Sequence, residues 1–423
     1  MAISLSTKFM NKVDSILFAG FLLAAVSCFA RQASAPPAPR IVDLTAADGV
    51  KLKASYFPAG KPGPGVLLLH QCDRDRKIWD GLAQQLAAAG INVLTMDLRG
   101  FGDSGGTPHN RGKTGPVEPP EEMQKWPADI DVAYEYLKSQ SDVKPGLIGV
   151  GGGSCGVSNA IKTAIRHPEV KSLVLLAGPS DVKDRMFLRQ SKTPAFLAVS
   201  DADPYPLMVP DTEWLYLASA SPGKKFAHYK TGGHAAEIFA VHPDLMTAIV
   251  DWYTVTLIKT PGQAPSSTNA PAILAEAKTW DLLEQPGGPA KLTQALSEAR
   301  QKDPKASLVM PQIVAESTDK NQKTLETGMQ QTIDEIGDEH FEAGDVKQSL
   351  EIAKLDALAY PNSPAAYFLL SQAYASQGQK NLARQDAEKA LALLPSDKLY
   401  GPDIHEEIKE AVQDILKQLD AVQ

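Results

Sequence analysis

Short apolar runs alternate with amphipathic stretches between residues 40 and 260. The apolar runs are nearly continuous, as in strands buried on both faces of a sheet. They cover residues 66–70, 91–96, 147–151, 172–177 and 195–200, and a further strand-like segment covers 225–229. Helical periodicity marks residues 78–89, 128–140, 155–167 and 243–258. The alternation predicts a mostly parallel sheet with helices on both faces.

Two connections in this region carry no strong periodic pattern. One is the Gly- and Pro-rich loop 100–124, and the other is the short connection 180–193. Neither is long enough to contain a large lid domain. The pattern therefore predicts a rather open site at the edge of the sheet.

A second, helical part is expected after this region. Residues 260–271 are rich in Pro, Ser, Thr and Ala and read as a linker between a first domain, 41–259, and an all-α domain, 272–423. Residues 349–361 and 383–395 align with a shift of 34 residues, which is the period of tetratricopeptide repeats. Asp356 departs from this pattern, which expects a small apolar residue there. Two repeats cannot bury their apolar faces alone, so helices within 272–299, 323–335 and 403–419 are expected to pack on and cap them.

The first forty residues have the pattern of an export signal. Lys8 and Lys12 precede an apolar run over 16–30, and a Pro- and Ala-rich spacer covers 31–40. The run is shorter than the roughly 20 residues that a spanning helix needs, which argues against a permanent membrane anchor. We therefore expect a signal peptide over 1–30 and a periplasmic or secreted protein. Cys28 lies in a degraded lipoprotein box, which leaves a lipid anchor there open.

Composition narrows the classes of partner. The chain has 423 residues and a formal net charge of −8, and it contains no tract of Lys and Arg that could neutralise a phosphate backbone. Nucleic acid is therefore excluded as an expected partner. Of the three cysteines, only Cys72 and Cys155 remain once the leader is removed, too few for a fold held together by disulfides.

A Gly-x-Ser-x-Gly sequence follows the predicted strand at 147–151. Ser154 stands between Gly152 and Gly156, immediately before a helical stretch, which is the pattern of a nucleophile elbow. Glycines two residues either side allow neighbouring backbone to pass without Cβ clashes. Cys155 is a rival nucleophile, but with Cys155 at the apex Val157 would stand where the pattern needs glycine. Ser154 is therefore the predicted nucleophile.

A serine hydroxyl needs a base and an acid that orients the base. His234 follows the strand-like segment 225–229 through a Thr-Gly-Gly turn and is the predicted base; His228 and His242 are less well placed. Asp203 follows the predicted strand 195–200 and is the predicted acid, with Asp201 as the alternative. The chain order Ser, Asp, His is that of α/β-hydrolase triads.

An oxyanion needs two backbone N–H donors. Cys155, directly after the nucleophile, supplies one, and Cys72 in the loop after the first core strand is the expected second, with Gln71 next. His70 is interpreted as a brace for this loop. Because both N–H groups would point at one oxygen, the two cysteines could be close enough for a disulfide, but nearby Cα atoms do not ensure that the side chains converge. The sequence leaves this pairing open.

Residues 41–259 resemble the dienelactone hydrolase branch of the α/β-hydrolases. The resemblance rests on the stretches DGVKLKASYF, VLLLHQC, NVLTMDLRGFGDSGG, IGVGGGSCGVSNA, AVSDADPYP and TGGHAAE. It departs from that branch at Ser154, where dienelactone hydrolases proper carry Cys, and at Gln71, where many relatives carry Gly. The C-terminal part resembles tetratricopeptide helices appended to various hydrolases, which implies a docking role and a protein partner.

These features together predict a serine hydrolase of the α/β-hydrolase fold. Its substrate is expected to be a small ester or related acyl compound, hydrolysed through an acyl-enzyme with no cofactor and no metal. Two alternatives stay open: an amidase or peptidase on the same triad, and a non-catalytic scaffold in which the helical repeats are the working part.

Overall fold

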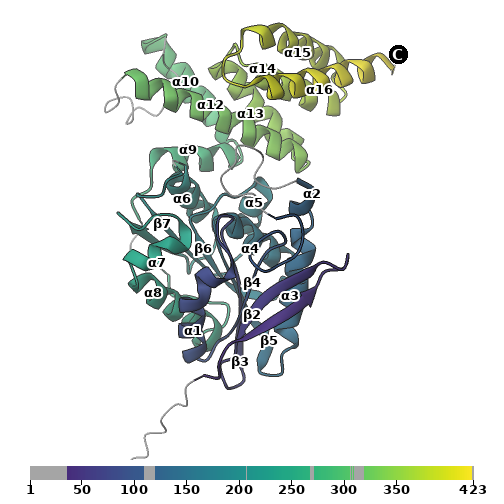
Figure 1. Ribbon diagram of the computed structural model, residues 1–423. Helices are drawn as coiled ribbons and strands as arrows, with labels where there is room; N and C mark the ends of the chain where they lie inside the picture. Colours follow the sequence, from purple (N-terminus) through teal and green to yellow (C-terminus); the bar gives the residue numbers. More distant parts are fainter. Residues whose placement is uncertain are drawn as a thin grey trace, which may run out of the picture. The chain divides into compact units, whose positions relative to one another are not determined.

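Eight strands form one sheet in the computed structural model, which describes residues 36–108, 120–205, 207–266, 271–304, 306, 308 and 319–421 (Figure 1). The strands are β1 (Arg40–Thr45), β2 (Lys51–Phe57), β3 (Gly63–Leu69), β4 (Asn92–Met96), β5 (Val143–Gly153), β6 (Val170–Leu176), β7 (Ala195–Ser200) and β8 (Lys225–Tyr229). Their spatial order is β1-β2-β4-β3-β5-β6-β7-β8. Strand β2 is antiparallel to its neighbours β1 and β4, and every pairing from β4 to β8 is parallel. The predicted mostly parallel sheet is confirmed, whereas the predicted leader 1–30, with Cys28, lies outside the described residues.

Helices connect the strands and cover both faces of the sheet (Figure 1). They are η1 (Arg76–Trp79), α1 (Asp80–Ala88), α2 (Pro120–Met123), α3 (Trp126–Ser139), α4 (Cys155–Arg166), α5 (Val182–Gln190), α6 (Met208–Ala218), η2 (Ala235–Glu237), α7 (Ile238–Val241), α8 (Asp244–Tyr253) and the π-helical turn η3 (Thr254–Lys259). The stretch predicted as one helix over 243–258 is thus α8 followed by η3.

The alternation of side chains in β3 shows why the strand sequences are continuously apolar. Val66 and Leu68 pack in the cluster that contains α1 and α8, whereas Leu67 and Leu69 pack in the cluster that contains α3 and α4. All four side chains are fully buried. A strand covered on both faces needs apolar residues at every position.

Two long helices, α5 and α6, were absent from the sequence prediction, as were the short helices α2 and α7. Helix α5 lies in the connection 180–193 and is capped by Asp181, whose side chain accepts a hydrogen bond from the backbone N–H of Asp184. Helix α6 buries a contiguous run over 212–216, so its sequence lacks the one-sided apolar stripe of a surface helix. Burial on more than one side therefore hid α6 from a periodicity analysis.

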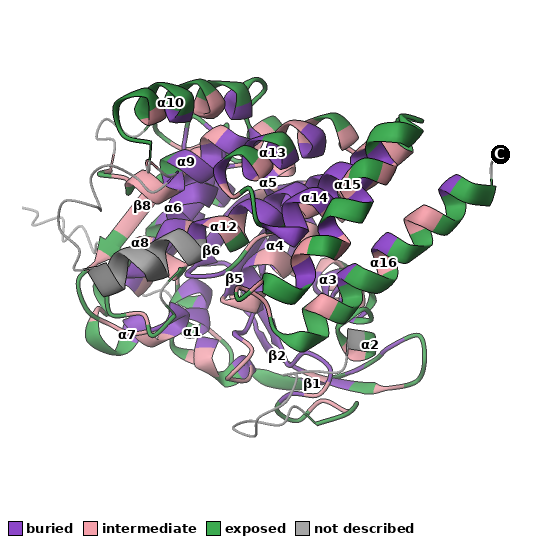
Figure 2. Ribbon diagram, turned by 90° about the horizontal axis from the view of Figure 1, so that it is seen from above, coloured by how far each residue is buried: buried purple, intermediate pink, exposed green. Residues whose placement is uncertain are grey.

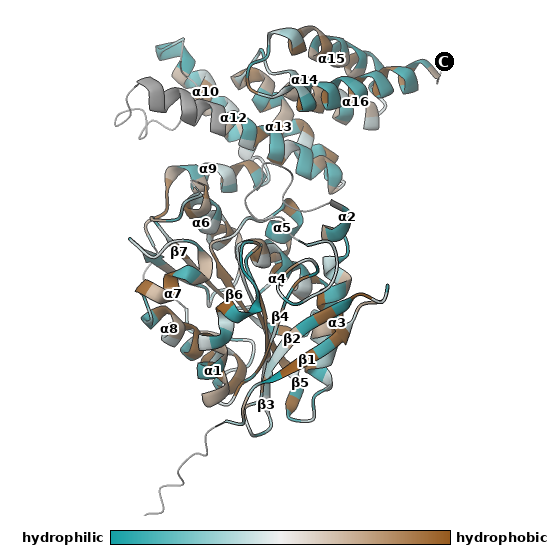
Figure 3. Cartoon of the chain, viewed as in Figure 1, coloured by the Kyte–Doolittle hydropathy of each residue, from teal (hydrophilic) through white to brown (hydrophobic). Residues whose placement is uncertain are grey.

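The C-terminal part is helical. It contains α9 (Ala275–Glu284), α10 (Gly288–Lys302), α12 (Asp319–Glu342), α13 (Val346–Ala359), α14 (Pro364–Ser376), α15 (Lys380–Leu393), η4 (Leu394–Ser396) and α16 (Pro402–Ala421). Most of α14 is buried whereas most of α10 is exposed (Figure 2), and α16 is largely hydrophilic apart from a narrow apolar side (Figure 3). No helix in the described part of the chain combines the length and the apolar character needed to cross a membrane.

Two helical hairpins occupy the region of the predicted repeats. Gly344 joins α12 to α13 and Gly378 joins α14 to α15, and both have left-handed φ angles, 82° and 72°. The same turn geometry therefore recurs at the predicted 34-residue spacing, while the assignment to tetratricopeptide repeats stays a prediction. Asp356, the residue that departs from the repeat pattern, is fully buried in α13.

The helices after the predicted linker pack directly on the sheet-containing part. Trp214 of α6 packs against Trp280 of α9 in a tilted arrangement with ring centroids 5.6 Å apart, and both residues are almost fully buried. The backbone N–H of Leu274 donates to Glu213 at 2.8 Å. Residues 36–423 form one compact unit, and the boundary at 260–271 stays a prediction.

A buried guanidinium joins these elements. The side chain of Arg185, in α5, is 2% exposed and lies over the Trp214 ring, with Cζ 3.7 Å from the centroid. Its Nε donates to Glu284 of α9 at 2.8 Å, and its Nη2 donates to Glu339 of α12 at 2.5 Å. Removing a charge from water is costly unless it is paired, so Arg185 requires both carboxylates in place.

We expect Glu284→Ala to lower the free energy of unfolding by about 3 kcal/mol, because it deprives a buried guanidinium of a buried partner. Chemical denaturation of the full chain measures this value. Glu351→Ala is the matched control, since Glu351 pairs with Lys354 on the exposed surface of α13 and should contribute less than about 0.5 kcal/mol. Equal effects of the two substitutions would contradict the structural role given to Arg185.

Candidate active site

The turn between β5 and α4 holds Ser154 in a strained conformation. Its φ is 53° and its ψ is −128°, a combination that few residues other than glycine adopt. Strand β5 ends at Gly153 and α4 begins at Cys155, so one residue makes the whole connection. Ser154 is partly exposed and follows β5 at the carboxyl edge of the sheet.

Close backbone approach explains both flanking glycines. A Cβ on Gly152 would lie 1.9 Å from the carbonyl oxygen of Gly156, and a Cβ on Gly156 would lie 2.5 Å from the carbonyl oxygen of Leu69. Neither distance is tolerable for a carbon atom. Any side chain at either position would force the turn open and displace Ser154.

Asp203 and His234 are brought together by the loops after β7 and β8. Nδ1 of His234 lies 2.7 Å from Oδ2 of Asp203, and the two side chains are 4% and 1% exposed. The ring of Tyr205 packs edge-on against His234, with centroids 4.7 Å apart. Nε2 of His234 is buried and makes no hydrogen bond with any residue that the structure describes. A histidine held this way can accept a proton at Nε2 while its other nitrogen stays fixed.

The alternative residues have other partners. Asp201 pairs with His228 and with Lys230, the latter at 2.6 Å. His242 contacts the hydroxyl of Thr231 at 3.0 Å. The structure thus places Asp203, and not Asp201, against His234.

Ser154 and His234 lie on adjacent loops without a direct hydrogen bond between them. A Cβ on Gly153 would lie 3.2 Å from Cβ of Ala235, so the turn that carries Ser154 packs against the residue that follows His234. Ala235 also has a positive φ, 48°. Two residues with strained backbones, Ser154 and Ala235, therefore lie where the two loops meet.

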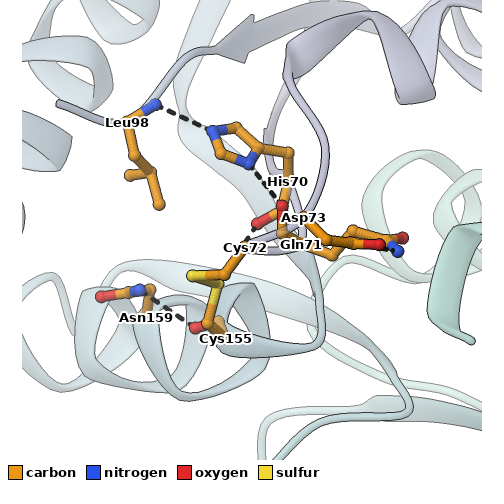
Figure 4. The surroundings of a disulfide bond; sticks show 7 residues. All are labelled: His70, Gln71, Cys72, Asp73, Leu98, Cys155 and Asn159. Atoms are coloured by element: carbon orange, nitrogen blue, oxygen red, sulfur yellow. Dashed lines mark hydrogen bonds between the residues drawn. A yellow bond between two sulfur atoms is a disulfide. The ribbon is translucent and has the colours of Figure 1, made fainter. Parts of the chain in front are cut away.

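Cys72 and Cys155 form a disulfide (Figure 4). Their Cα atoms are 5.8 Å apart although 83 residues separate them in the sequence. His70 braces the same loop: its Nε2 accepts from the backbone N–H of Leu98 at 2.9 Å, and its Nδ1 lies 2.8 Å from the carbonyl oxygen of Gln71. The pairing that the sequence left open is therefore present, and His70 has the bracing role that its position predicted.

Further contacts join the loop after β3 to the loop that carries His234. The amide oxygen of Gln71 accepts from the backbone N–H of Ala236 at 3.2 Å, and Arg74 pairs with Glu237. Glu237 also accepts from the backbone N–H of His234 at 3.2 Å. Sequence analysis missed Arg74, Tyr205 and Glu237, although an acidic residue three positions after the start of a helical turn is a capping signal that could have revealed Glu237.

The family model described as serine aminopeptidase, S33, matches residues 60–202. This range contains β3 to β7 and Ser154, and it ends one residue before Asp203. The match agrees with the observed sheet, in which β2 is antiparallel to β1 and β4 and every pairing from β4 to β8 is parallel. The first part of the chain has the α/β-hydrolase fold.

Individual relatives match only part of this chain. An uncharacterized protein of Mycobacterium tuberculosis is 35% identical over 134 residues, which are 31% of this chain and 43% of that protein. A thiohydrolase of Aspergillus aculeatus is 26% identical over 136 residues, 31% of this chain and 39% of that protein. The chain thus spans less than half the length of these curated relatives.

Solved structures with a similar backbone cover about half of the chain. The complex of DcsB with its substrate analogue has a TM-score of 0.44 at 14% identity and covers 52% of this chain and 100% of that one. The Pyrococcus furiosus esterase has a TM-score of 0.42 at 20% identity and covers 52% of this chain and 91% of that one.

We predict that mass spectrometry of the denatured, unreduced and alkylated protein finds a peptide pair joined through Cys72 and Cys155. Replacing both residues by Ser should lower the free energy of unfolding by about 2–4 kcal/mol, because the bond closes a long loop in the unfolded chain. Alkylation of both thiols without prior reduction would show that the bond is absent.

Proposed function

We propose that this chain is a serine hydrolase acting on an ester or related acyl substrate. The observation that carries the proposal is the combination of the strained Ser154 with the buried pair of Asp203 and His234, which come from the loops after β7 and β8. An activated serine requires this combination of exposed hydroxyl, base and orienting acid.

The mechanism follows from these positions. Oγ of Ser154 attacks the acyl carbon while His234 takes its proton at Nε2, and Asp203 stabilises the resulting imidazolium. The backbone N–H groups of Cys155 and Cys72 are the proposed donors to the oxyanion; the first belongs to the opening turn of α4, whose N–H groups lack intrahelical acceptors. His234 then protonates the leaving group, and water, deprotonated by the same ring, releases the acid from the acyl-enzyme.

The disulfide gives the proposed oxyanion site a fixed geometry. It joins the loop after β3 to the first residue of α4, which are the two segments that carry the proposed donors. Donors held in place before the reaction need no reorganisation as negative charge develops. We therefore propose that reduction of this disulfide lowers turnover even under conditions in which the reduced protein stays folded.

The proposal also covers the class of substrate, export and a protein partner. Ser154 in place of a cysteine favours general acyl hydrolysis over the dienelactone reaction, and the related thiohydrolase adds thioesters to the candidate substrates. The serine aminopeptidase family model keeps amides in consideration, because the same triad hydrolyses both. Export through the leader 1–30 and a protein partner for the tetratricopeptide-like helices are likewise proposed. Within the described ranges, no three side chains of His, Cys, Asp or Glu are grouped so as to hold a metal ion.

Ser154→Ala should lower kcat for an aryl acetate by about 10³-fold or more without changing the unfolding transition, because no other group replaces the attacking oxygen. Labelling by a fluorophosphonate probe should disappear in the same variant. A folded parent protein that the probe never labels would instead favour the scaffold alternative. A panel of acyl esters, thioesters and amides of graded chain length identifies the substrate class.

Asp203→Asn should lower kcat by about 10³–10⁴-fold, because the amide no longer stabilises the imidazolium or selects the correct ring tautomer. Asp201→Asn is the matched control: Asp201 lies two residues away, follows the same strand and pairs with His228 and Lys230. Steady-state kinetics on one aryl ester compares them. A larger loss in Asp201→Asn would reverse the assignment of the acid.

A further inference from the structure

A cavity of about 350 Å³ is lined by both halves of the chain, and one of its lining residues, Tyr205, contacts the proposed catalytic histidine. The sheet-containing part contributes Tyr205, whose ring packs against His234, together with Met208 and Asp211. Helix α9 contributes Trp280, and α12 contributes a wall that includes Glu335 and Ile336. The prediction of an open site considered only the loops 100–124 and 180–193 and did not foresee this wall.

We propose that α12 forms one wall of the substrate pocket and that this pocket receives a cationic group of the substrate. The inference rests on the proposed hydrolase function, because it assigns the cavity to the substrate of Ser154. It gives the helical part a role in selecting the substrate in addition to the proposed docking role.

The position of α12 is fixed by packing and by charge. Ile336 is 2% exposed and belongs to the apolar cluster that contains Trp214 of α6. One turn further along the helix, Glu339 accepts the hydrogen bond from Arg185. A wall held in this way presents the same side chains to each substrate molecule, which is what selectivity requires.

The cavity has more carboxylates than cations. Asp211, Glu335 and Glu339 line it, and Arg185 is the basic residue among the lining residues. Arg185 already donates to Glu284, to Glu339 and to the carbonyl oxygen of Ser180 at 2.6 Å. Asp211 makes no side-chain hydrogen bond with any described residue, so its carboxylate lacks the partner that a partly buried anion needs.

The raised pKa values of two lining carboxylates agree with this interpretation. Burial raises the pKa of Asp211 to about 7, opposed by Arg185 and reinforced by Glu335 and Glu339. Burial likewise raises the pKa of Glu339 to about 7 against the lowering effect of Arg185. Carboxylates whose charged form is destabilised in this way gain most from a bound cation.

The acidic lining continues beyond this cavity. A second cavity of about 680 Å³ shares Leu207, Thr332 and Glu335 with the first and extends between α12, α14 and α16. Asp338 and Glu407 line it, and no Lys or Arg is among its described lining residues. A cationic substrate would therefore meet a negative surface along its approach to the catalytic residues.

An aromatic side chain of this cavity could also bind a cation. Tyr205 is 51% exposed, lines the first cavity and packs its ring against His234. An ammonium group is attracted to the face of an aromatic ring as well as to carboxylates. The expected ligand class is therefore an acyl compound that carries an ammonium or guanidinium group at a distance from the scissile bond.

The test compares isosteric esters that differ only in charge. One series carries a terminal trimethylammonium group on acyl chains of graded length, and the other carries a terminal tert-butyl group. At the best length, kcat/KM for the cationic ester should exceed that for its neutral partner by about tenfold or more, and the ratio should fall at least about fivefold in Asp211→Asn/Glu335→Gln. Glu351→Gln, an exposed carboxylate of α13, is the control and should leave the ratio unchanged. Equal rates for both series, or a ratio that the double variant retains, would overturn the proposal.

A second variant tests the wall without changing charge. Thr332 lies on α12 and lines both cavities, so Thr332→Trp should lower the ratio of long-chain to acetyl ester turnover by about tenfold through loss of space. An unchanged ratio in a folded variant would show that α12 does not contact the substrate.

Calorimetric titration with hexyltrimethylammonium separates this inference from the proposed function. If the parent binds this cation and the double variant does not, the cationic site is supported. This holds even if the protein hydrolyses no ester, and then only the hydrolase proposal fails. Aryl acetate hydrolysis by the parent without such binding would refute the cationic site and leave the hydrolase proposal standing.

Discussion

The burial of Arg185 is the constraint that joins the two parts of this chain. A guanidinium with almost no contact with water requires compensating charge, and Glu284 and Glu339 supply it from α9 and α12. Arg189 extends the network by pairing with Glu284 at 2.9 Å. Because the ring of Trp214 covers the same guanidinium, apolar packing and charge pairing fix one arrangement of the helices. These helices supply one side of the cavity that Tyr205 also lines.

The proposed catalytic residues depend on a different principle, the convergence of parallel strands. The segments after β3, β5, β7 and β8 all emerge at the carboxyl edge of the sheet, where loops far apart in sequence meet. The disulfide and the hydrogen bond from Ala236 to Gln71 then hold three of these loops together. Such cross-links limit the motion of each loop separately. A strained serine can persist only where its surroundings are this firmly determined.

The two networks have different consequences for the proposed enzyme. Contacts among the loops set the position of the reacting groups, whereas the Arg185 network sets the shape and charge of the adjoining cavity. In the proposed enzyme, chemistry and substrate selection would therefore belong to separate structural elements that are linked through Tyr205. A change in α12 can alter which acyl groups enter without moving the pair formed by Asp203 and His234. This separation is also the reason that a helical extension can adapt a common fold to a particular substrate.

Local patterns in the sequence determined the strands β3 to β8, the serine turn and the segments that carry Asp203 and His234, whereas β1 and β2 were not predicted. They could do so because burial on both faces demands continuous apolar residues and because a tight turn excludes a Cβ at Gly152 and Gly156. Tertiary structure alone decided that Cys72 and Cys155 bond, since side-chain direction cannot be read from spacing. It also decided that Arg185 pairs with carboxylates 99 and 154 residues away, and that α12 lines the cavity. Charge pairing over such separations leaves no periodic signal in the sequence, because each partner is an ordinary polar residue on its own helix.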